Sequence, residues 1–194
     1  MTRGRRGRRG RPAVPALVLT GLLAGCTHVV AGQPSPAPLT LAETQVAAYP
    51  AGQLHTRDTV GYPETPPVGG QHDPSWADCT GTVYLTPIRP ENAVHSLEHG
   101  AVWITYDPAL TDDADVDVLT ALVGGRPGLM LSPYPDQGVP VSLQAWDHQV
   151  QVEEAADPRV AQFAELLAFN PETTPEPGAT CENPLFLADQ PQPA

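Results

Sequence analysis

Two histidines and a glutamate lie within five consecutive residues, and side chains of these types can bind a transition metal ion. His95 and His99 are four positions apart, so a helical turn would place both imidazoles on one face, with Glu98 beside them. His72, in a loop upstream, can supply a further nitrogen. Imidazole together with carboxylate suits zinc or Cu(II). The sequence therefore predicts a metal site with His95 and His99 as ligands and Glu98 or His72 as the third.

Two other interpretations of these residues stay open. The histidines could form a buried, hydrogen-bonded cluster with a structural role, in a non-catalytic protein that binds a partner in the cell envelope. Alternatively, the run from His95 to His99 matches H-x-x-E-H, a pattern in which two histidines hold zinc and the glutamate activates water for hydrolysis. That chemistry needs a long active-site helix, and Gly100 is expected to end this helix at once, which disfavours a hydrolase.

The segment that carries these residues is predicted to be a short helix followed by a buried strand. Gly100 can adopt a positive φ just beyond the end of a helix. Residues 101–106 then have the β-branched and aromatic composition of a core strand. We therefore expect the two histidines at a rigid junction between helix and strand.

The remaining periodicity predicts more strands and two amphipathic helices. Helix 111–123 is expected to begin after Thr111 as N-cap, and helix 158–169 after Asp157, with Pro158 in its first turn. The further strands are expected at 82–86, 128–132, 139–146 and 149–153. The predicted fold class is α+β: a mostly antiparallel sheet of four or five strands, two helices packed on one face, and long irregular proline-rich loops.

The amino-terminal residues have the pattern of a bacterial lipoprotein signal. Six arginines within the first eleven residues precede an apolar run from Ala13 to Ala24, and small residues lead to Cys26. Cleavage before Cys26 and lipidation of its sulfur would anchor the protein to the outer face of the bacterial cell membrane. The arginine pairs leave both the general secretory route and the twin-arginine route open.

Composition divides the chain into four predicted segments. These are a signal peptide at 1–25, a flexible tether rich in proline, alanine and serine at 26–50, a single α+β domain at 51–170, and a proline-rich acidic tail at 171–194. Loss of residues 1–25 would leave four arginines and no lysine against 22 acidic residues, a formal charge of −18. Such a surface repels phosphate backbones, so nucleic acid is not an expected partner.

The three cysteines are consistent with an oxidising compartment. With Cys26 lipidated, Cys79 and Cys181 remain as an even pair, and the simplest inference is a disulfide between them. Closing a loop of about one hundred residues would stabilise the fold by up to roughly 4–5 kcal/mol and hold the tail to the domain. In the alternative, Cys79 is a metal ligand near His72 and Cys181 stays free.

A combination of motifs extends over most of the chain. It consists of Pro66-Pro-Val-Gly-Gly-Gln-His72, Trp76, the run Glu91–Tyr106, Ser132-Pro-Tyr-Pro135 and Ala145-Trp146. Together they resemble the bacterial family called domain of unknown function 3105, over roughly residues 55–169. The resemblance implies an exported or membrane-tethered protein with one conserved fold, and it implies no particular activity or substrate.

Overall fold

The structure is a computed structural model that describes residues 1–2 and 37–189. Cys26, residues 3–25 of the predicted signal peptide and residues 26–36 of the predicted tether lie outside the described residues. The chain divides into two units, Met1–Pro34 and Ser35–Ala194, and every described helix and strand belongs to the second.

One five-stranded sheet forms the centre of this second unit. Its strands are β1 (Thr80–Val83), β2 (Val102–Tyr106), β3 (Leu129–Pro133), β4 (Val141–Ala145) and β5 (His148–Val152), in the order β1-β3-β2-β4-β5. Strand β3 pairs in parallel with both β1 and β2. The pairs β2–β4 and β4–β5 are antiparallel.

The predicted α+β class is confirmed, but the prediction of a mostly antiparallel sheet is wrong, because the sheet is mixed. Helix α3 (Asp113–Val123) connects β2 to β3, and a helical crossover of this kind returns the chain so that the next strand runs parallel to the last. The sequence shows which elements follow one another. It does not show that β3 inserts between β1 and β2.

Five helices occur in the described residues: α1 (Leu41–Thr44), α2 (Pro90–Glu98), α3, α4 (Pro158–Leu167) and α5 (Pro184–Ala188). The predicted start of α4 is confirmed, since Asp157 is its N-cap and accepts a hydrogen bond from Arg159 N. For α3 the cap is Asp112 and not Thr111, because the Asp112 carboxylate accepts from Asp115 N. Two acidic residues in its first turn add a favourable interaction with the helix dipole.

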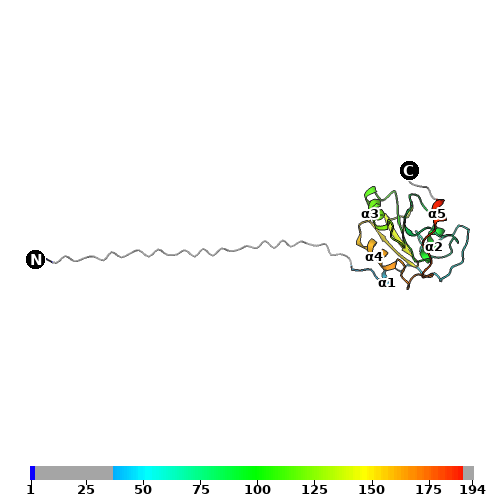
Figure 1. The fold of residues 1–194 in the computed structure, drawn as a ribbon, viewed down its shortest axis with the longest axis horizontal. Coiled ribbons are helices and arrows are strands. Elements are labelled where there is room, and N and C mark those ends of the chain that lie inside the picture. Colours follow the sequence, from blue (N-terminus) through cyan, green and yellow to red (C-terminus); the bar gives the residue numbers. More distant parts are fainter. Residues whose placement is uncertain (3–36, 190–194) are drawn as a thin grey trace. The chain divides into compact units, whose positions relative to one another are not determined.

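The sheet separates two hydrophobic cores. Successive side chains of a strand point to opposite faces, so Ile104 belongs to the core shared with α3 and α4, and its neighbour Trp103 to the core shared with α2. Figure 1 shows α3 and α4 on one side of the sheet and α2 on the other. The first core includes Leu119, Leu131, Leu143, Phe163 and Leu167, and the second includes Val94, Leu97, Met130 and Trp146.

Segments outside the sheet are tied to it at both ends of the described chain. Leu39 and Leu41, from the segment predicted to be a tether, pack against the first core. In the tail, α5 brings Phe186 against the second core, and the predicted disulfide between Cys79 and Cys181 is present. None of the helices in residues 37–189 combines the length and the apolar character needed to cross a bilayer.

Gly100 occupies the turn between α2 and β2 with φ +94°, as the sequence predicted. A Cβ here would lie 2.8 Å from Thr174 Oγ1 and 3.2 Å from Phe169 Cα. Gly138 has a similar φ of +84°, yet a Cβ there would meet nothing within 4 Å. The two glycines therefore share a backbone conformation and differ in crowding.

Gly100→Ala is expected to lower the free energy of unfolding more than Gly138→Ala does. Both substitutions should cost about 1–2 kcal/mol for the left-handed backbone, and only Gly100→Ala adds a steric clash. Urea unfolding of the two variants and the parent protein measures the difference. Equal losses would show that Thr174 moves aside freely and that the turn is not crowded.

Candidate metal centre

Helix α2 is buried from Glu91 to Glu98, and main-chain carbonyls of residues 73–77 accept hydrogen bonds from three of its polar side chains. Residues Glu91 to Glu98 are all buried. Asn92 Nδ2 donates to Ser75 O at 2.6 Å and Ser96 Oγ donates to Ala77 O at 2.7 Å. In the same series His95 Nδ1 lies 2.6 Å from Asp73 O. Every second carbonyl of this segment thus accepts from α2, which fixes the helix and the loop to each other.

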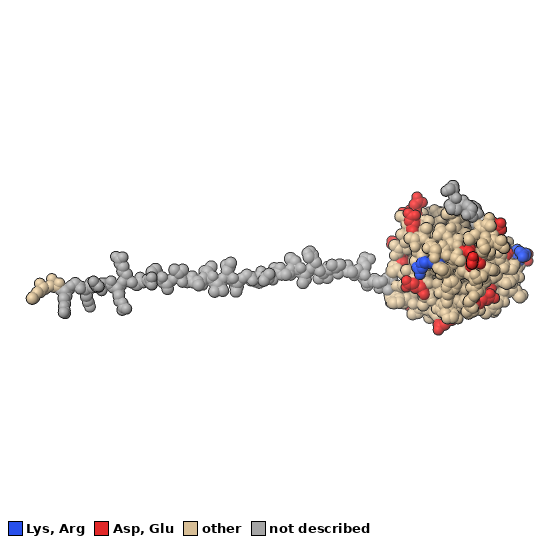
Figure 2. Space-filling view, in the orientation of Figure 1, with Lys and Arg blue, Asp and Glu red and all other residues tan. Residues whose placement is uncertain are grey.

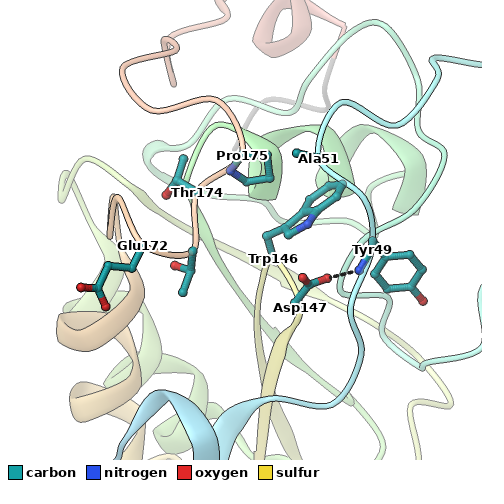
Figure 3. Close-up of a pocket in the computed structure, with 8 residues that line it drawn as sticks. Tyr49, Ala51, Trp146, Asp147, Glu172, Thr174 and Pro175 are labelled. Atoms are coloured by element: carbon teal, nitrogen blue, oxygen red, sulfur yellow. Dashed lines mark hydrogen bonds between the residues drawn. The ribbon is translucent and has the colours of Figure 1, made fainter.

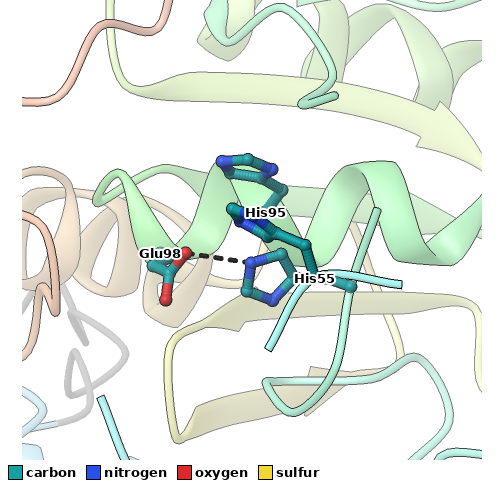
Figure 4. Close-up of side chains that lie close together, drawn as sticks. His55, His95 and Glu98 are labelled. Carbon is teal, nitrogen blue, oxygen red and sulfur yellow. Dashed lines mark ion pairs between the residues drawn. The ribbon is translucent and has the colours of Figure 1, made fainter. Parts of the chain in front are cut away.

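Four side chains converge beside α2. His55, His72, His95 and Glu98 each offer one ligand atom, and these four atoms lie within 4.8 Å of one another. Figure 4 shows His95 and Glu98 projecting from the helix toward His55 on the neighbouring segment. His72, His95 and Glu98 are buried, whereas His55 is exposed. His55 and His72 are brought together by a single parallel bridge between their backbones.

The hydrogen bonds of two imidazoles fix which nitrogen faces the cluster. His72 Nδ1 lies 2.8 Å from Gly70 O, and His95 Nδ1 has the Asp73 carbonyl as its partner. A carbonyl oxygen only accepts, so both Nδ1 atoms carry the hydrogen and donate. In the neutral ring Nε2 then has a free lone pair. In metal sites a carbonyl oxygen commonly accepts from the other ring nitrogen of a histidine ligand and orients the ring in this way.

The contact between His72 and Glu98 brings two acceptors together. His72 Nε2 lies 2.9 Å from Glu98 Oε2. Neither His72 Nε2 nor the other oxygen, Glu98 Oε1, has a hydrogen-bond partner among the described residues, and both atoms are buried. Two lone pairs facing each other away from water are unfavourable unless a cation lies between or beside them. That cation is either a proton or a metal ion.

Burial and mutual proximity set the charge states of the cluster. Burial, together with the nearby His99, His72 and His55, lowers the pKa of His95 to about 4, against the opposing hydrogen bond to Asp73. For Glu98, burial by itself would raise the pKa, but the surrounding imidazoles outweigh it and hold the pKa below its usual value. A neutral imidazole beside an ionised carboxylate is the state that binds a cation.

The dimensions of the cluster suit a four-coordinate ion. Zinc–ligand bonds are about 2.0–2.2 Å long, so tetrahedral ligand atoms are roughly 3.4 Å apart. With a largest separation of 4.8 Å, an ion would draw the widest pair together by up to about 1.4 Å, which side-chain rotation can supply. Three nitrogens and one oxygen are a donor set for zinc or Cu(II).

The structure brings together three of the four predicted site residues, His72, His95 and Glu98. His99 is the C-cap of α2 and is not one of the four. Its Nδ1 lies 2.7 Å from Thr180 O, and its Nε2 lies 3.7 Å from Glu176 Oε2. The ring therefore contacts the tail, although its centroid is only 4.6 Å from that of His95.

His55 is the residue that sequence reasoning missed. It lies in a segment without helical or strand periodicity, 40 residues before His95. The available signal was its position at the start of the region that carries the family motifs, which also contains the loop histidine, His72. Trp76 also belongs to this neighbourhood, with its ring centroid 4.9 Å from His99 and 5.6 Å from His95.

A separate cavity of about 290 Å³ is lined in part by Trp146. Figure 3 shows Trp146 and Asp147 in its lining, with Tyr49 N donating to Asp147 Oδ1 at 2.7 Å. The ring centroid of Trp146 lies 6.1 Å from that of His72. Trp146 thus lines the cavity and also lies near the histidine cluster, whereas none of the four cluster residues lines the cavity.

A comparison with known protein families assigns the chain to one family. Residues 54–183 match the family described as "Protein of unknown function (DUF3105)", so the chain belongs to this family and the resemblance found in the sequence is confirmed. All four cluster residues fall inside the matched region. A search of curated proteins gave no significant match, and a search of solved structures gave none either.

The lowered pKa of His95 predicts that the metal-free protein loses stability as pH falls below about 6.5. The unfolded histidine takes up a proton near pH 6.5, whereas the folded one does so only near pH 4. Between these values the unfolded state binds more protons, so the free energy of unfolding should fall, by about 2 kcal/mol at pH 5. Urea unfolding in chelator-treated buffer at pH 7 and pH 5 measures this loss.

His95→Gln is the control for this effect. It should reduce the pH dependence between pH 7 and pH 5, leaving the smaller contribution of His99, whose pKa burial also lowers. An unchanged pH dependence in His95→Gln would contradict the assignment of the effect to this residue.

Proposed function

We propose that this protein binds a transition metal ion, zinc or Cu(II), through His55, His72, His95 and Glu98. The observation that carries the proposal is the buried contact between His72 Nε2 and Glu98 Oε2, two acceptors 2.9 Å apart. Two further imidazoles lie within 4.8 Å, so a metal ion would replace an unfavourable contact by four bonds. In the structural alternative, a proton lies between His72 Nε2 and Glu98 Oε2 and the two side chains form a hydrogen bond.

Soft ligands do not take part. Cys79 and Cys181 are joined in a disulfide, and Met130 lies in the second core on strand β3. A Cu(I) carrier would need such sulfur donors, whereas imidazole and carboxylate favour zinc or Cu(II). The cysteine alternative raised from the sequence, with Cys79 as a metal ligand near His72, is therefore not proposed.

Peptide hydrolysis is not proposed either. The H-x-x-E-H pattern requires both histidines on one zinc ion. Here His95 is in the cluster, while His99 is turned to Thr180 and Glu176. Glu98 contacts His72 directly, which is the position of a ligand and not that of a base poised over a bound water.

We further propose that the protein is an extracytoplasmic lipoprotein anchored through Cys26. The apolar run, the small residues before Cys26 and the arginines at the amino terminus support this, as does the disulfide between Cys79 and Cys181. The visible face of the domain in Figure 2 carries scattered acidic side chains and few arginines. An acidic surface raises the local concentration of cations and disfavours nucleic acid.

Metal uptake tests the ligand set. The mature protein should bind about one equivalent of zinc or copper at neutral pH, measured by elemental analysis after gel filtration. His72→Ala is expected to abolish uptake, because it removes a buried ligand and no exposed side chain is available to replace it. His99→Gln is the matched control, since it removes a buried histidine at the same helix end that lies outside the cluster. No uptake by the parent protein would refute the metal proposal.

Thermal unfolding separates the metal site from a structural cluster. A ligand that binds only the folded state stabilises it by about 2.7 kcal/mol at one hundred times its Kd. Added zinc should therefore raise the Tm of the parent and of His99→Gln, and should leave the Tm of His72→Ala unchanged. If a proton holds the pair instead, His72→Ala will lower the Tm while zinc shifts none of the three proteins.

The anchor at Cys26 predicts a change of compartment on substitution. Cys26→Ser should remove the lipid and move the protein from the membrane fraction to the soluble extracytoplasmic fraction. Mass spectrometry of the parent protein from native envelopes should find an amino-terminal cysteine carrying diacylglycerol. A parent protein that begins at Met1, or carries no lipid, would contradict the anchor.

A further inference from the structure

We infer that His55 is an exchangeable ligand, through which the ion enters and leaves a site whose other three ligands are fixed. This inference rests on the proposed metal binding and adds that the bound ion can be exchanged. The protein would hold an ion that it takes up and releases, in contrast to a structural metal sealed in a core. The inference follows from how differently the four side chains are held.

Three of the ligands are immobilised. The exposed fraction is 0% for His72, 4% for His95 and 1% for Glu98. Both histidines are tied by Nδ1 to main-chain carbonyls, and Glu98 lies on the buried helix α2. Neither histidine can turn away without breaking a hydrogen bond in a region closed to water, which is costly, and Glu98 is enclosed by its burial. They therefore form a preformed half of the site.

His55 is held in the opposite way. Five histidines are described, and four of them place Nδ1 on a main-chain carbonyl: His72, His95, His99 and His148. The ring of His55 makes no such bond with any described residue, and the residue is exposed. It makes only ring contacts with its neighbours, edge-on to His72 and stacked on His95, with centroid distances of 4.9 Å in both pairs. Such contacts involve no hydrogen bond that would have to break when the ring rotates.

The backbone that carries His55 is fixed, so the ring alone can move. Thr56 N donates to His72 O at 2.7 Å, directly after His55. Arg89 donates to Arg57 O at 3.1 Å and to Asp58 O at 2.9 Å. The same guanidinium contacts Asp73 Oδ2 at 2.6 Å and Glu91 Oε2 at 3.0 Å. Arg89 thereby joins the His55 segment to the loop and the helix that hold the other ligands.

These observations define the exchange step. When the His55 ring turns outward, its bond to the ion breaks and a water molecule takes the open position, with no change in charge or oxidation state. His72, His95 and Glu98 keep the ion in place. The vacated position faces solvent, so a small nitrogen donor can occupy it, and a stronger chelator can then remove the ion.

Cobalt(II) and free imidazole test this directly, because the visible spectrum of Co(II) reports its ligands. His55→Ala should still bind one Co(II), about tenfold more weakly, which corresponds to about 1.4 kcal/mol. It should release the ion to EDTA at least about tenfold faster than the parent. Millimolar imidazole should restore its affinity and give it the parent spectrum. Leu54→Ala, a change at the neighbouring residue, which is 75% exposed, should match the parent in every measurement.

His95→Gln is the comparison for a fixed ligand, with circular dichroism to establish that it folds. Its lost affinity should not return with imidazole, because the vacated position is closed to solvent. The inference is overturned if His55→Ala has the affinity and release rate of the parent, or if it binds no Co(II) even with imidazole. A parent protein that binds no Co(II), zinc or copper would instead refute the proposed function itself.

Discussion

The alternating hydrogen bonds between α2 and residues 73–77 are the constraint on which the rest of the structure depends. A helix with Asn92, His95 and Ser96 on its surface cannot be buried unless each polar group finds a partner. The carbonyls of Asp73, Ser75 and Ala77 supply those partners at every second residue. Because the segment is fixed by the helix, the loop before it, with His72, is fixed as well. One set of bonds thus satisfies three polar side chains of a buried helix, orients the His95 imidazole and positions the loop that carries His72.

The parts of the fold that follow from local chemistry could be predicted from the sequence. Gly100 ends α2 with a positive φ because L side chains rarely adopt that conformation, and Asp157 with Pro158 starts α4 because both residues suit a helix amino terminus. The disulfide could be inferred from an even count of cysteines once Cys26 was set aside. The strands followed from their β-branched residues, within a few positions.

What could not be predicted depends on partners distant in sequence. The insertion of β3 between β1 and β2 makes the sheet mixed, and no local pattern encodes it. Spacing places His95 and His99 on one face of a helix, but it does not show which residues lie opposite that face. The tail meets His99 through Thr180, and a loop without periodicity brings His55 to His95. Two histidines equivalent by spacing therefore have different surroundings.

The way the carboxyl-terminal segment closes over α2 affects the order in which the molecule can be completed. The acceptor for His99 lies 81 residues further along the chain, and the cysteine that meets Cys79 lies 102 residues after it. A ribosome therefore makes the whole sheet and all four converging side chains before it makes the segment that seals the helix end. A growing chain thus contains the four converging side chains before it contains the residues that cover His99.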